Sequence, residues 1–493
     1  MATDSKLITR ICDPKSITFP GSLNASDLPK ISSQGTEDAL KLAAHHLVEL
    51  EDVVAFPTET VYGLGANALS PNAVSRIFST KGRPQDNPLI VHVSSLPMLR
   101  DILPKDYTIS PVYQALISKF WPGPLSVLFP ANADVIPKSV TAGHATVAIR
   151  MPSHPVARAV IAFSGKPIAA PSANTSGKPS PTRAEHVVQD TGSTGKLSLL
   201  LDGGPCAVGV ESTVVDGLDP DGNLRILRPG GVTVEDLEKV VDSLNYQNGR
   251  RPKVLVHRRD YEDKVIEIAP TTPGMKYRHY SPSVPVIMLL TISKDPTGKA
   301  SLSFADAIKG VSESLKTKGD SLLKLGLLAT SDSPLWEKHP IEGVDIEKFV
   351  LGKSSDPATS AARLFDGLLT LERRGVQAIL LQGNQFMFIN ELNLRYISEQ
   401  YFRLAGLFEP VINGIPVLPI YDVNSNSIIW GTAFSRVPDN NSPEVAVCPQ
   451  MAISTSLERF NHSFISTYQV KFSLEFLIPE SSYFNNYTTR LLN

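Results

Sequence analysis

Apolar residues recur at helix and strand spacings along the first half of the chain. Leu40, Ala43, Leu47 and Leu50 follow one another at steps of three and four residues, which predicts an amphipathic helix. Short apolar runs bounded by polar or turn-forming residues predict buried strands in the same region. The pattern as a whole predicts strands at 53–56 and 89–93 and helices at 73–78 and 234–244.

The second half carries a smaller unit of the same kind. Strands are expected at 284–290, 325–329 and 378–381, and helices at 305–315 and 357–373. Because strands and helices alternate, this segment predicts an α/β layer architecture. A chain of 493 residues is also too long for one ordinary core. We therefore predict a mobile lead-in (1–35), a first domain (36–245), a linker (246–283), a small second domain (284–382) and a tail (383–493).

A basic turn lies within residues 77–92 and runs into a predicted strand. Lys81 and Arg83 supply a point charge and a planar fork, one residue apart. Gly82 allows the backbone to approach a ligand closely, and prolines on both sides of the turn stiffen it. Two cations in a loop are more often a solvated surface feature, so the hypothesis of an anion site depends on other motifs.

Clusters of small side chains follow two other predicted strands. One contains Gly63-x-Gly65-x-x-Ala68, which imitates a dinucleotide fingerprint. We interpret it as a turn, because the acidic residue that should end the next strand is absent. In the other cluster, Ser172 and Asn174 point the same way if the backbone is extended. Such groups suit phosphate or ribose oxygens, although a polar turn or a helix cap would use them equally well.

Two arginines, Arg150 and Arg228, lie at the ends of predicted strands. A buried arginine needs an anionic partner, which is either a substrate or a structural ion pair. Residues 273–282 interleave aromatic and imidazole rings with Lys276 and Arg278 between prolines. This segment is either an exposed anion-binding loop or a solvated linker, and composition alone favours the linker.

The composition of the chain argues against several classes of protein function. A hydrophobic content of 42% and a net charge of −2 describe a globular protein with no bulk attraction to nucleic acid or anionic membranes. Cys12, Cys206 and Cys448 are odd in number and far apart, which argues against a disulfide framework and fits a reducing compartment. The chain has no Cys-x-x-Cys pair and no apolar run of the ~18–20 residues that span a membrane. The N-terminus lacks a signal-peptide pattern, so we expect a cytoplasmic protein that does not enter a membrane.

Several of these motifs occur together, in an order that resembles the YrdC/YciO family. The trailing α/β unit and the segment Pro-Gly-Met-x-Tyr-x-His-Tyr-Ser-Pro from Pro273 are similar to the long form of that family, which makes L-threonylcarbamoyladenylate. The resemblance covers roughly residues 40–382. The other motifs are Pro57-Thr58-Glu59-Thr60-Val61-Tyr62-Gly63-Leu64-Gly65, Lys81-x-Arg83, Asn87-Pro88, Ser172-x-Asn174, Ser180-Pro181-Thr182 and Glu211-Ser212-Thr213.

The resemblance implies a fold and a reaction. The fold is a twisted YrdC-like α/β domain with a concave basic face, followed by a linker and a smaller, Rossmann-like α/β domain. The reaction is that of a nucleotidyltransferase: the amine of L-threonine captures CO2 or bicarbonate, and the carbamate attacks the α-phosphate of ATP and releases pyrophosphate. The product would pass to a separate transferase complex that modifies tRNA. Mg²⁺ is expected with the ATP, on phosphate and water ligands, and no metal site is expected in the protein.

The resemblance also assigns roles to residues. Lys81 and Arg83 would act on the polyphosphate as the catalytic pair, and Tyr280 would close over the nucleotide as a lid that excludes water. Arg150 would hold the threonine carboxylate in a two-pronged pair, with Thr146 beside it. The full set of implied contacts is Arg83, Asn87, Ser172, Asn174, Ser180, Arg228 and Tyr280 for ATP, and Thr60, His92, Thr146, Arg150 and Ser212 for threonine.

The tail departs from the family. After Gln382 the family continues with a glycine-rich turn and a final helix carrying Asn-Arg-Leu, which this sequence lacks. Lys471 is the single lysine after Lys353, and the tail is rich in Asn, Ser, Phe and Ile. The alternatives are a lineage-specific extension and a translated intron or shifted frame. The abrupt change in mid-domain favours the second.

Two other functions compete with the synthase. One is a non-catalytic module that binds tRNA or double-stranded RNA on the same basic concavity. The complete linker with Lys276, His279 and Tyr280 favours the enzyme, because an RNA platform needs no lid. The other is a related carbamoyl-adenylate activity, which would normally come with hydrolase and zinc-finger modules that the cysteine pattern does not support.

Overall fold

The computed structural model describes most of the chain up to residue 384. The described residues are 7–25, 28–246, 251–257, 260–261, 263, 270–273, 279–291, 304–315, 322–336 and 342–384, with strand residues 411–412, 415–416, 419–422 and 427–430. The larger of two compact units comprises 1–312 and 316–408, and the smaller comprises 313–315 and 409–493. None of the helices in the described ranges is long and apolar enough to cross a membrane.

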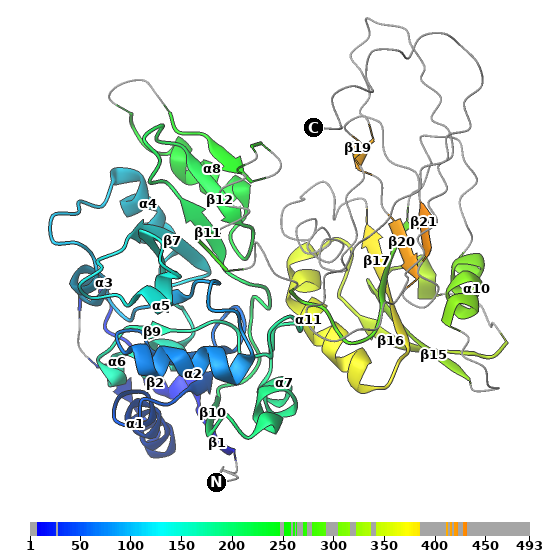
Figure 1. The fold of residues 1–493 in the computed structure, drawn as a ribbon, viewed down its shortest axis with the longest axis horizontal. Coiled ribbons are helices and arrows are strands. Elements are labelled where there is room, and N and C mark those ends of the chain that lie inside the picture. The colour runs from blue at the N-terminus through cyan, green and yellow to red at the C-terminus, as the bar shows by residue number, and fades with distance from the viewer. Residues whose placement is uncertain are drawn as a thin grey trace, which may run out of the picture. The chain divides into compact units, whose positions relative to one another are not determined.

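The larger unit is built on a mixed eleven-stranded sheet (Figure 1). The strand order is β1-β10-β4-β5-β9-β6-β8-β7-β11-β12-β13. A separate short ladder joins β2 (Ile17–Thr18) to β3 (Lys30–Ile31). The strands of the large sheet are β1 (Ile8–Ile11), β4 (Val54–Phe56), β5 (Gly63–Asn67), β6 (Ile90–His92), β7 (Leu125–Pro130), β8 (Thr146–Arg150), β9 (Ile168–Ala169), β10 (Leu199–Asp202), β11 (Thr213–Asp216), β12 (Leu224–Arg228) and β13 (Val254–Val256).

Helices cover both faces of this sheet. In β4, Val54 and Phe56 belong to one buried apolar cluster with α1 and α6, whereas Ala55 belongs to another with α2 and α4. This alternation is the period of two that a strand between two cores requires. The helices are α1 (Gln34–Val48), α2 (Pro71–Lys81), α3 (Leu96–Ile102), α4 (Pro111–Phe120), α5 (Lys138–Thr141), α6 (Pro155–Ser164), α7 (Ala184–Gln189) and α8 (Val234–Asp242).

Capping residues explain where the first helices begin. The hydroxyl of Ser33 accepts a hydrogen bond from the backbone N–H of Thr36, so α1 begins earlier than the apolar spacing indicates. The hydroxyl of Ser70 caps α2 in the same way, and Pro71 occupies its first turn. Of the apolar residues that predict α1, Leu50 lies beyond the end of the helix and is 46% exposed.

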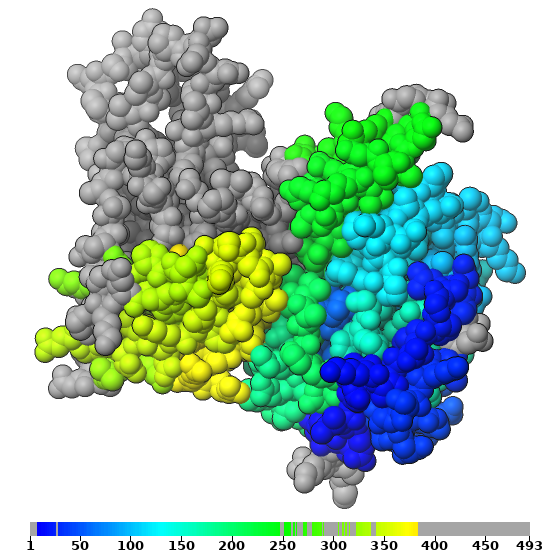
Figure 2. Space-filling model, turned by 180° about the vertical axis from the view of Figure 1, so that it is seen from behind, coloured from blue at the N-terminus to red at the C-terminus, as the bar shows by residue number. Residues whose placement is uncertain are grey.

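The segment before residue 36 differs from the mobile lead-in that the sequence predicts. β1 adds a parallel strand to the edge of the sheet beside β10, and Cys12 after it is buried. The ring of Phe19 lies 4.2 Å from the guanidinium carbon of Arg158. Figure 2 shows these N-terminal residues, in dark blue, lying against the surface of the molecule. Serine and proline enrichment therefore marks tight turns between short strands here, and not a free arm.

Two further segments differ from the prediction. Residues 63–67 form strand β5, which pairs with β4 and β9, where the glycines predicted a turn. A Cβ atom at Gly65 would overlap the ring of Phe56, so this glycine serves close packing within the sheet. β13 lies inside the predicted linker, yet it extends the sheet beside β12.

The second predicted domain forms a four-stranded parallel sheet in the order β14-β17-β15-β16. β16 was not predicted, because its sequence alternates apolar residues with Asp345, Glu347 and Lys348 and only partly enters the core. The other predicted elements are present with small shifts at their ends. The elements are β14 (Val286–Thr291), α10 (Phe304–Leu315), β15 (Leu323–Ala329), β16 (Val344–Val350), α11 (Pro357–Arg373) and β17 (Ala378–Asn384).

Beyond β17 the structure describes two short antiparallel pairs. They are β18 (Val411–Ile412) with β19 (Ile415–Pro416), and β20 (Pro419–Asp422) with β21 (Ser427–Trp430). The rest of the predicted tail, and Lys276 and Arg278 of the linker, lie outside the described residues.

Candidate active site

Several strands of the large sheet begin or end along the same edge, which is formed by strand ends and not by an outermost strand. β6 and β8 run parallel, and their last residues, His92 and Arg150, are register partners. β7 is antiparallel to β8, β11 is parallel to β7, and β12 is antiparallel to β11. The carboxyl ends of β6, β8 and β12 therefore meet the amino ends of β7 and β11. This brings Ser126, Ser212 and Arg228 to the same edge.

The basic turn begins where α2 ends. Gly82 has a φ of 61°, in the left-handed region, and its N–H donates to the carbonyl of Phe78. The buried ammonium of Lys81 donates to the backbone carbonyl oxygens of Ser172 and, at 2.5 Å, of Asn174. Burial and the nearby charge of Arg83 lower the pKa of Lys81 to about 7. Lys81 thus ties the turn to the Ser-x-Asn segment and can change its charge near neutral pH.

Arg83 is held by the backbone that follows it. Its Nε donates to the carbonyl of Asn87 at 3.2 Å and its Nη2 to that of Pro88 at 2.8 Å. Burial and the charge of Arg228 lower the pKa of Arg83 to about 9, so it stays protonated at neutral pH. The amide nitrogen of Asn87 is buried and has no hydrogen-bond partner within the described structure.

Arg150 is fixed by three contacts. Its Nε donates to the carbonyl of Gly123 at 3.2 Å, its Nη1 to the hydroxyl of Thr60 at 3.0 Å, and its Nη2 to Glu59 Oε1 at 2.7 Å. A guanidinium has five N–H groups, so two remain for a carboxylate. Burial and the charge of Arg150 lower the pKa of His92 to about 3, so His92 is neutral at physiological pH.

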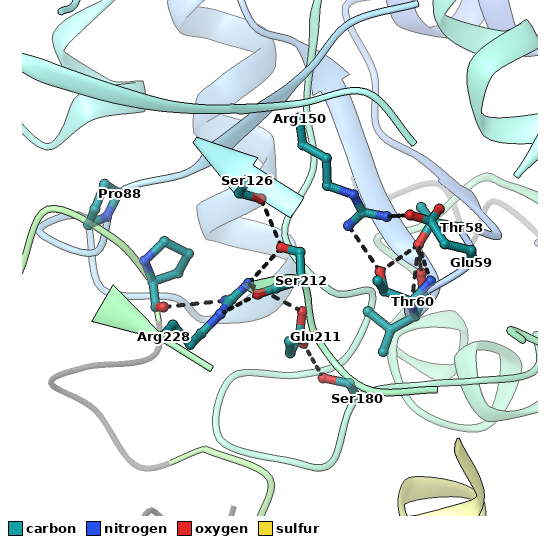
Figure 3. Close-up of polar contacts among 12 residues, drawn as sticks. Thr58, Glu59, Thr60, Pro88, Ser126, Arg150, Ser180, Glu211, Ser212 and Arg228 are labelled. Atoms are coloured by element: carbon teal, nitrogen blue, oxygen red, sulfur yellow. Dashed lines mark hydrogen bonds and ion pairs between the residues drawn. The ribbon is translucent and has the colours of Figure 1, made fainter. Parts of the chain in front are cut away.

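A second polar network lies beside the first (Figure 3). Ser212 Oγ lies 2.8 Å from Ser126 Oγ and accepts from Arg228 Nη2 at 3.0 Å. The hydroxyl of Ser180 donates to Glu211 Oε1 at 2.7 Å, and Glu211 Oε2 lies 3.9 Å from Arg228 Nη2. Arg228 is buried, as are Arg83 and Arg150, so three guanidinium groups occupy this edge of the sheet.

The Ser-x-Asn segment folds into a tight loop. Asn174 Nδ2 donates to the carbonyls of Thr175 and Lys178, both at 2.9 Å, while its Oδ1 is buried without a partner in the described structure. Asp190 accepts from the backbone N–H of Thr175 at 2.6 Å and from Lys178 Nζ at 3.0 Å. Asp190, directly after α7, therefore holds the loop in place. The amide nitrogen of Asn174 also helps to keep the shape of the loop.

One cavity joins these networks, and with its mouth it holds about 530 Å³ of space. Val61, Ile90, Ala170 and Pro171 give the wall an apolar part. The lining includes eight of the predicted site residues, which are Thr60, Arg83, His92, Arg150, Ser172, Ser212, Arg228 and Tyr280.

The other predicted residues do not line this cavity. Lys81, Asn87 and Ser180 each contact a residue that does, namely Ser172, Arg83 and Glu211. Asn174 contacts Lys81, Thr175 and Lys178, which lie outside the lining. Thr146 is different, because it begins β8 whereas Arg150 ends it. Four residues of extended strand span ~13 Å, so Thr146 does not lie beside Arg150 as the sequence prediction supposed.

The sequence prediction gave three residues of this region no contact with a ligand, and His279 among them was interpreted as a scaffold residue. Glu211 is the one carboxylate among the described lining residues, and Glu59 neutralises Arg150 from behind. His279 also lines the cavity, and burial beside Arg83 and Arg228 lowers its pKa to about 3. Glu59 and Glu211 belong to quoted motifs, but the partner of each lies far away in the sequence and is brought to it by the fold.

The cavity suits a metal that arrives with its own ligands. No group of three or more His, Cys, Asp or Glu side chains gathers at one point within the described ranges. Among the described lining residues, Glu211 offers the carboxylate. Mg²⁺ bound to a nucleotide takes several water and phosphate oxygens and one or two carboxylates, so this donor set is compatible with such an ion.

Family models match most of the described chain. A model described as "Telomere recombination", of the Sua5, YciO and YrdC proteins, matches residues 46–230. A model of the C-terminal domain of threonylcarbamoyl-AMP synthase matches residues 232–390.

Relatives that cover most of the chain carry one name. The threonylcarbamoyl-AMP synthase of Schizosaccharomyces pombe is 41% identical over 75% of this chain and 91% of its own length. That of Pyrococcus abyssi is also 41% identical, over 67% of this chain and 85% of its own. A crystal structure of P. abyssi Sua5 complexed with L-threonine matches 81% of this chain and 98% of that one, with a TM-score of 0.61 and 35% identity.

Proposed function

Because this chain belongs to the threonylcarbamoyl-AMP synthase family, we propose that it joins L-threonine, bicarbonate or CO2, and ATP into L-threonylcarbamoyl-AMP with release of pyrophosphate. One observation carries the proposal. A guanidinium with two unused N–H groups, that of Arg150, lines the same cavity as the guanidinium groups of Arg83 and Arg228. An amino-acid carboxylate and a polyphosphate can therefore be held side by side.

Such a reaction needs little covalent chemistry from the protein. The amine of threonine attacks carbon dioxide, loses a proton and becomes a carbamate. A carbamate oxygen then attacks the α-phosphorus of ATP, and the bond to the pyrophosphate leaving group breaks. Positioning the reactants and stabilising charge on the phosphate oxygens supply most of the rate in phosphoryl-type transfers. The cluster of arginines at the cavity suits that task.

In this proposal, threonine binds at the carboxyl ends of β6 and β8. Its carboxylate accepts from the two unused N–H groups of Arg150, and the hydroxyls of Thr60 and Ser212 hold its polar groups. His92 stays neutral and contributes a hydrogen bond without adding charge. The presence of L-threonine in the P. abyssi structure supports this class of substrate.

ATP binds across the basic turn. Arg83 and Arg228 hold phosphate oxygens, while Asn87 supports the side chain of Arg83 and Asn174 holds the neighbouring Lys81. Among the described residues that line the cavity, Glu211 carries the carboxylate that could contact Mg²⁺ arriving with the triphosphate, and water and phosphate oxygens would supply its other ligands.

Tyr280 closes the cavity. Its side chain is 5% exposed and lines the site together with His279. A mixed anhydride with AMP hydrolyses readily, so excluding water protects the product until it leaves. We further propose that the product is used by a separate transferase that modifies tRNA.

Pyrophosphate release by the purified chain tests this function. ATP, Mg²⁺, threonine and bicarbonate are supplied together, and each of the last two is then omitted. Release that needs both supports the proposal, and serine in place of threonine should give slower release. No release from folded protein, combined with binding of tRNA, would favour the RNA-binding alternative.

A further inference from the structure

One face of α11 contacts three segments that carry site residues. The contacts are made by Ala362, Phe365 and Asp366, which are three and four residues apart and so share a face of the helix. α11 belongs to the layer that covers the four-stranded sheet and lies outside the eleven-stranded sheet that forms the site. Covering the four-stranded sheet therefore does not by itself explain why α11 contacts the site segments.

The first contact is an ion pair with the segment after Ser180. Arg183 donates to Asp366 through Nε at 3.2 Å and Nη2 at 3.1 Å, in the two-pronged geometry that guanidinium and carboxylate prefer. His186 Nε2 lies 3.5 Å from the same carboxylate, and its Nδ1 accepts from the backbone N–H of Thr182. Asp366 is nine-tenths buried. The carboxylate thus fixes the chain two and three residues beyond Ser180, whose hydroxyl holds Glu211.

The second contact is a ring stack under the lid. The rings of Tyr280 and Phe365 lie 5.0 Å apart at 30°, and Phe365 is buried. Tyr280 has a φ of 56°, a left-handed conformation that is unfavourable for a residue with a Cβ. Such a conformation persists only where the surroundings hold it. Phe365 is one of the groups that hold it.

The third contact is a close backbone approach. A Cβ atom at Gly209 would overlap the carbonyl oxygen of Ala362, and Gly209 itself has a φ of 65°. Two and three residues later come Glu211 and Ser212, which line the cavity. Val61 and Val210 pack into the same apolar cluster as Phe365.

We propose that α11 is a positioning element of the nucleotide site, with Asp366 and Phe365 as its positioning residues. Neither side chain lines the cavity, so both act through groups that do. Asp366 sets the segment from Ser180 to Arg183, and Phe365 holds the ring of Tyr280. Arg150 and His92 are placed by strands of the large sheet and do not depend on α11. Losing these contacts should therefore weaken the binding of ATP more than that of threonine.

The inference rests on the proposed function, because it assumes that the cavity binds ATP. Isothermal titration of the full chain with a non-hydrolysable ATP analogue measures nucleotide affinity without turnover. Asp366→Asn keeps the size of the side chain and removes its charge. We expect the analogue to bind about tenfold more weakly, as for one lost charge-assisted contact, and threonine affinity to change less than about twofold.

Arg183→Gln tests the same contact from the other side. The Arg183 side chain is 41% exposed, so this variant should fold normally. Because both residues act through one contact, the double variant should bind the analogue no more weakly than the weaker single variant. Asp366→Glu should recover part of the affinity. Wild-type analogue affinity in both single variants would overturn the proposal.

Phe365→Leu and Leu371→Ala separate positioning from general stability. Leu371 is also buried in α11 and belongs to the same apolar cluster as Phe365, but its side chain lies against Gly326 in β15. We expect Leu371→Ala to lower the Tm and to leave analogue affinity within about twofold, whereas Phe365→Leu weakens binding about fivefold or more. Analogue affinity that follows the Tm across all these variants would assign α11 a purely structural role and overturn the proposal.

The two proposals can fail separately. A chain that binds the analogue with the expected dependence on Asp366, yet releases no pyrophosphate with threonine and bicarbonate, contradicts the synthase function alone. A chain that makes pyrophosphate normally, with an analogue affinity indifferent to Asp366 and Phe365, contradicts the role of α11 alone.

Discussion

Within the described part of the chain, Arg150 makes three hydrogen bonds and has two N–H groups left. The two-pronged pair with a carboxylate can be tested by a substitution that keeps the positive charge. Arg150→Lys keeps a cation opposite the buried Glu59 and avoids the penalty of an unpaired buried carboxylate. We expect the KM for threonine to rise about tenfold or more, because lysine cannot form the two-pronged pair. The KM for ATP should change less than about twofold. Steady-state pyrophosphate assays give both values.

Arg76→Lys is the matched control for that change. Arg76 is exposed and pairs with Asp52 outside the cavity. The Arg76→Lys substitution should leave both KM values unchanged, since exposed ion pairs contribute little to stability. A threonine KM that rises equally in both variants, or in neither, would contradict the assignment of Arg150.

ATP binding should be coupled to proton uptake by Lys81. With a pKa of about 7 in the folded protein, Lys81 is largely neutral at pH 8, whereas in the unfolded chain it stays protonated up to about pH 10. The unfolded state therefore binds more protons between these values, and the Lys81 contribution to stability rises with pH across that window. Bound phosphates favour the charged form, so ATP binding at pH 8 should take up protons.

Calorimetric titrations of ATP at pH 8 in buffers of different ionisation enthalpy measure that uptake. Lys81→Met should remove most of it, and Lys178→Met, on a neighbouring and more exposed lysine, should not. Equal proton uptake in wild type and Lys81→Met would show that Lys81 does not respond to the nucleotide.

How far the site can be predicted from the sequence depends on how many residues separate the side chains that interact in it. Arg83 and Arg228 could be singled out because arginine at a turn or a strand end is locally conspicuous, and both line the cavity. Glu59 could not, because its partner Arg150 lies 91 residues away. Thr146 was misplaced because proximity in sequence does not give proximity along an extended strand.

At the scale of elements, apolar spacing located most helices and strands, while packing and pairing decided the rest. β5 carries Gly63 and Gly65, which predict a turn, but neighbouring strands and the ring of Phe56 require glycine there. β1 is exposed along its whole length and has no burial pattern to detect. Strand pairing over long distances is the information that local periodicity lacks.

Gly65→Ala tests the close packing of β5. Its Cβ would overlap Phe56 and come within 2.8 Å of Ile168, both in the core. We expect the free energy of unfolding to fall by about 1–3 kcal/mol, as for other overpacked cores. Gly35→Ala is the control, because that glycine lies in α1 with open space around it and should gain up to about 1 kcal/mol. Urea titrations measure both, and equal effects would contradict the packing role of Gly65.

At the scale of the whole chain, the family match and the sequence agree on where the common part ends. The match to the synthase C-terminal domain stops at residue 390, close to the change in composition after Gln382. A chain that stops after residue 390 keeps β17, which a cut at 382 would shorten. We expect the shorter chain to retain kcat/KM for ATP and for threonine within about twofold. A larger loss would show that residues 391–493 contribute to catalysis.

The central claim is that one cavity joins threonine, a one-carbon unit and AMP. Mass spectrometry of the product formed from ¹³C-bicarbonate, threonine and ATP, with the product kept cold to limit hydrolysis, tests it most directly. The claim predicts a threonylcarbamoyl-AMP ion that is one mass unit heavier than that from ordinary bicarbonate and that appears in step with pyrophosphate. Pyrophosphate release without the labelled adduct, or an adduct that lacks the label, would contradict it.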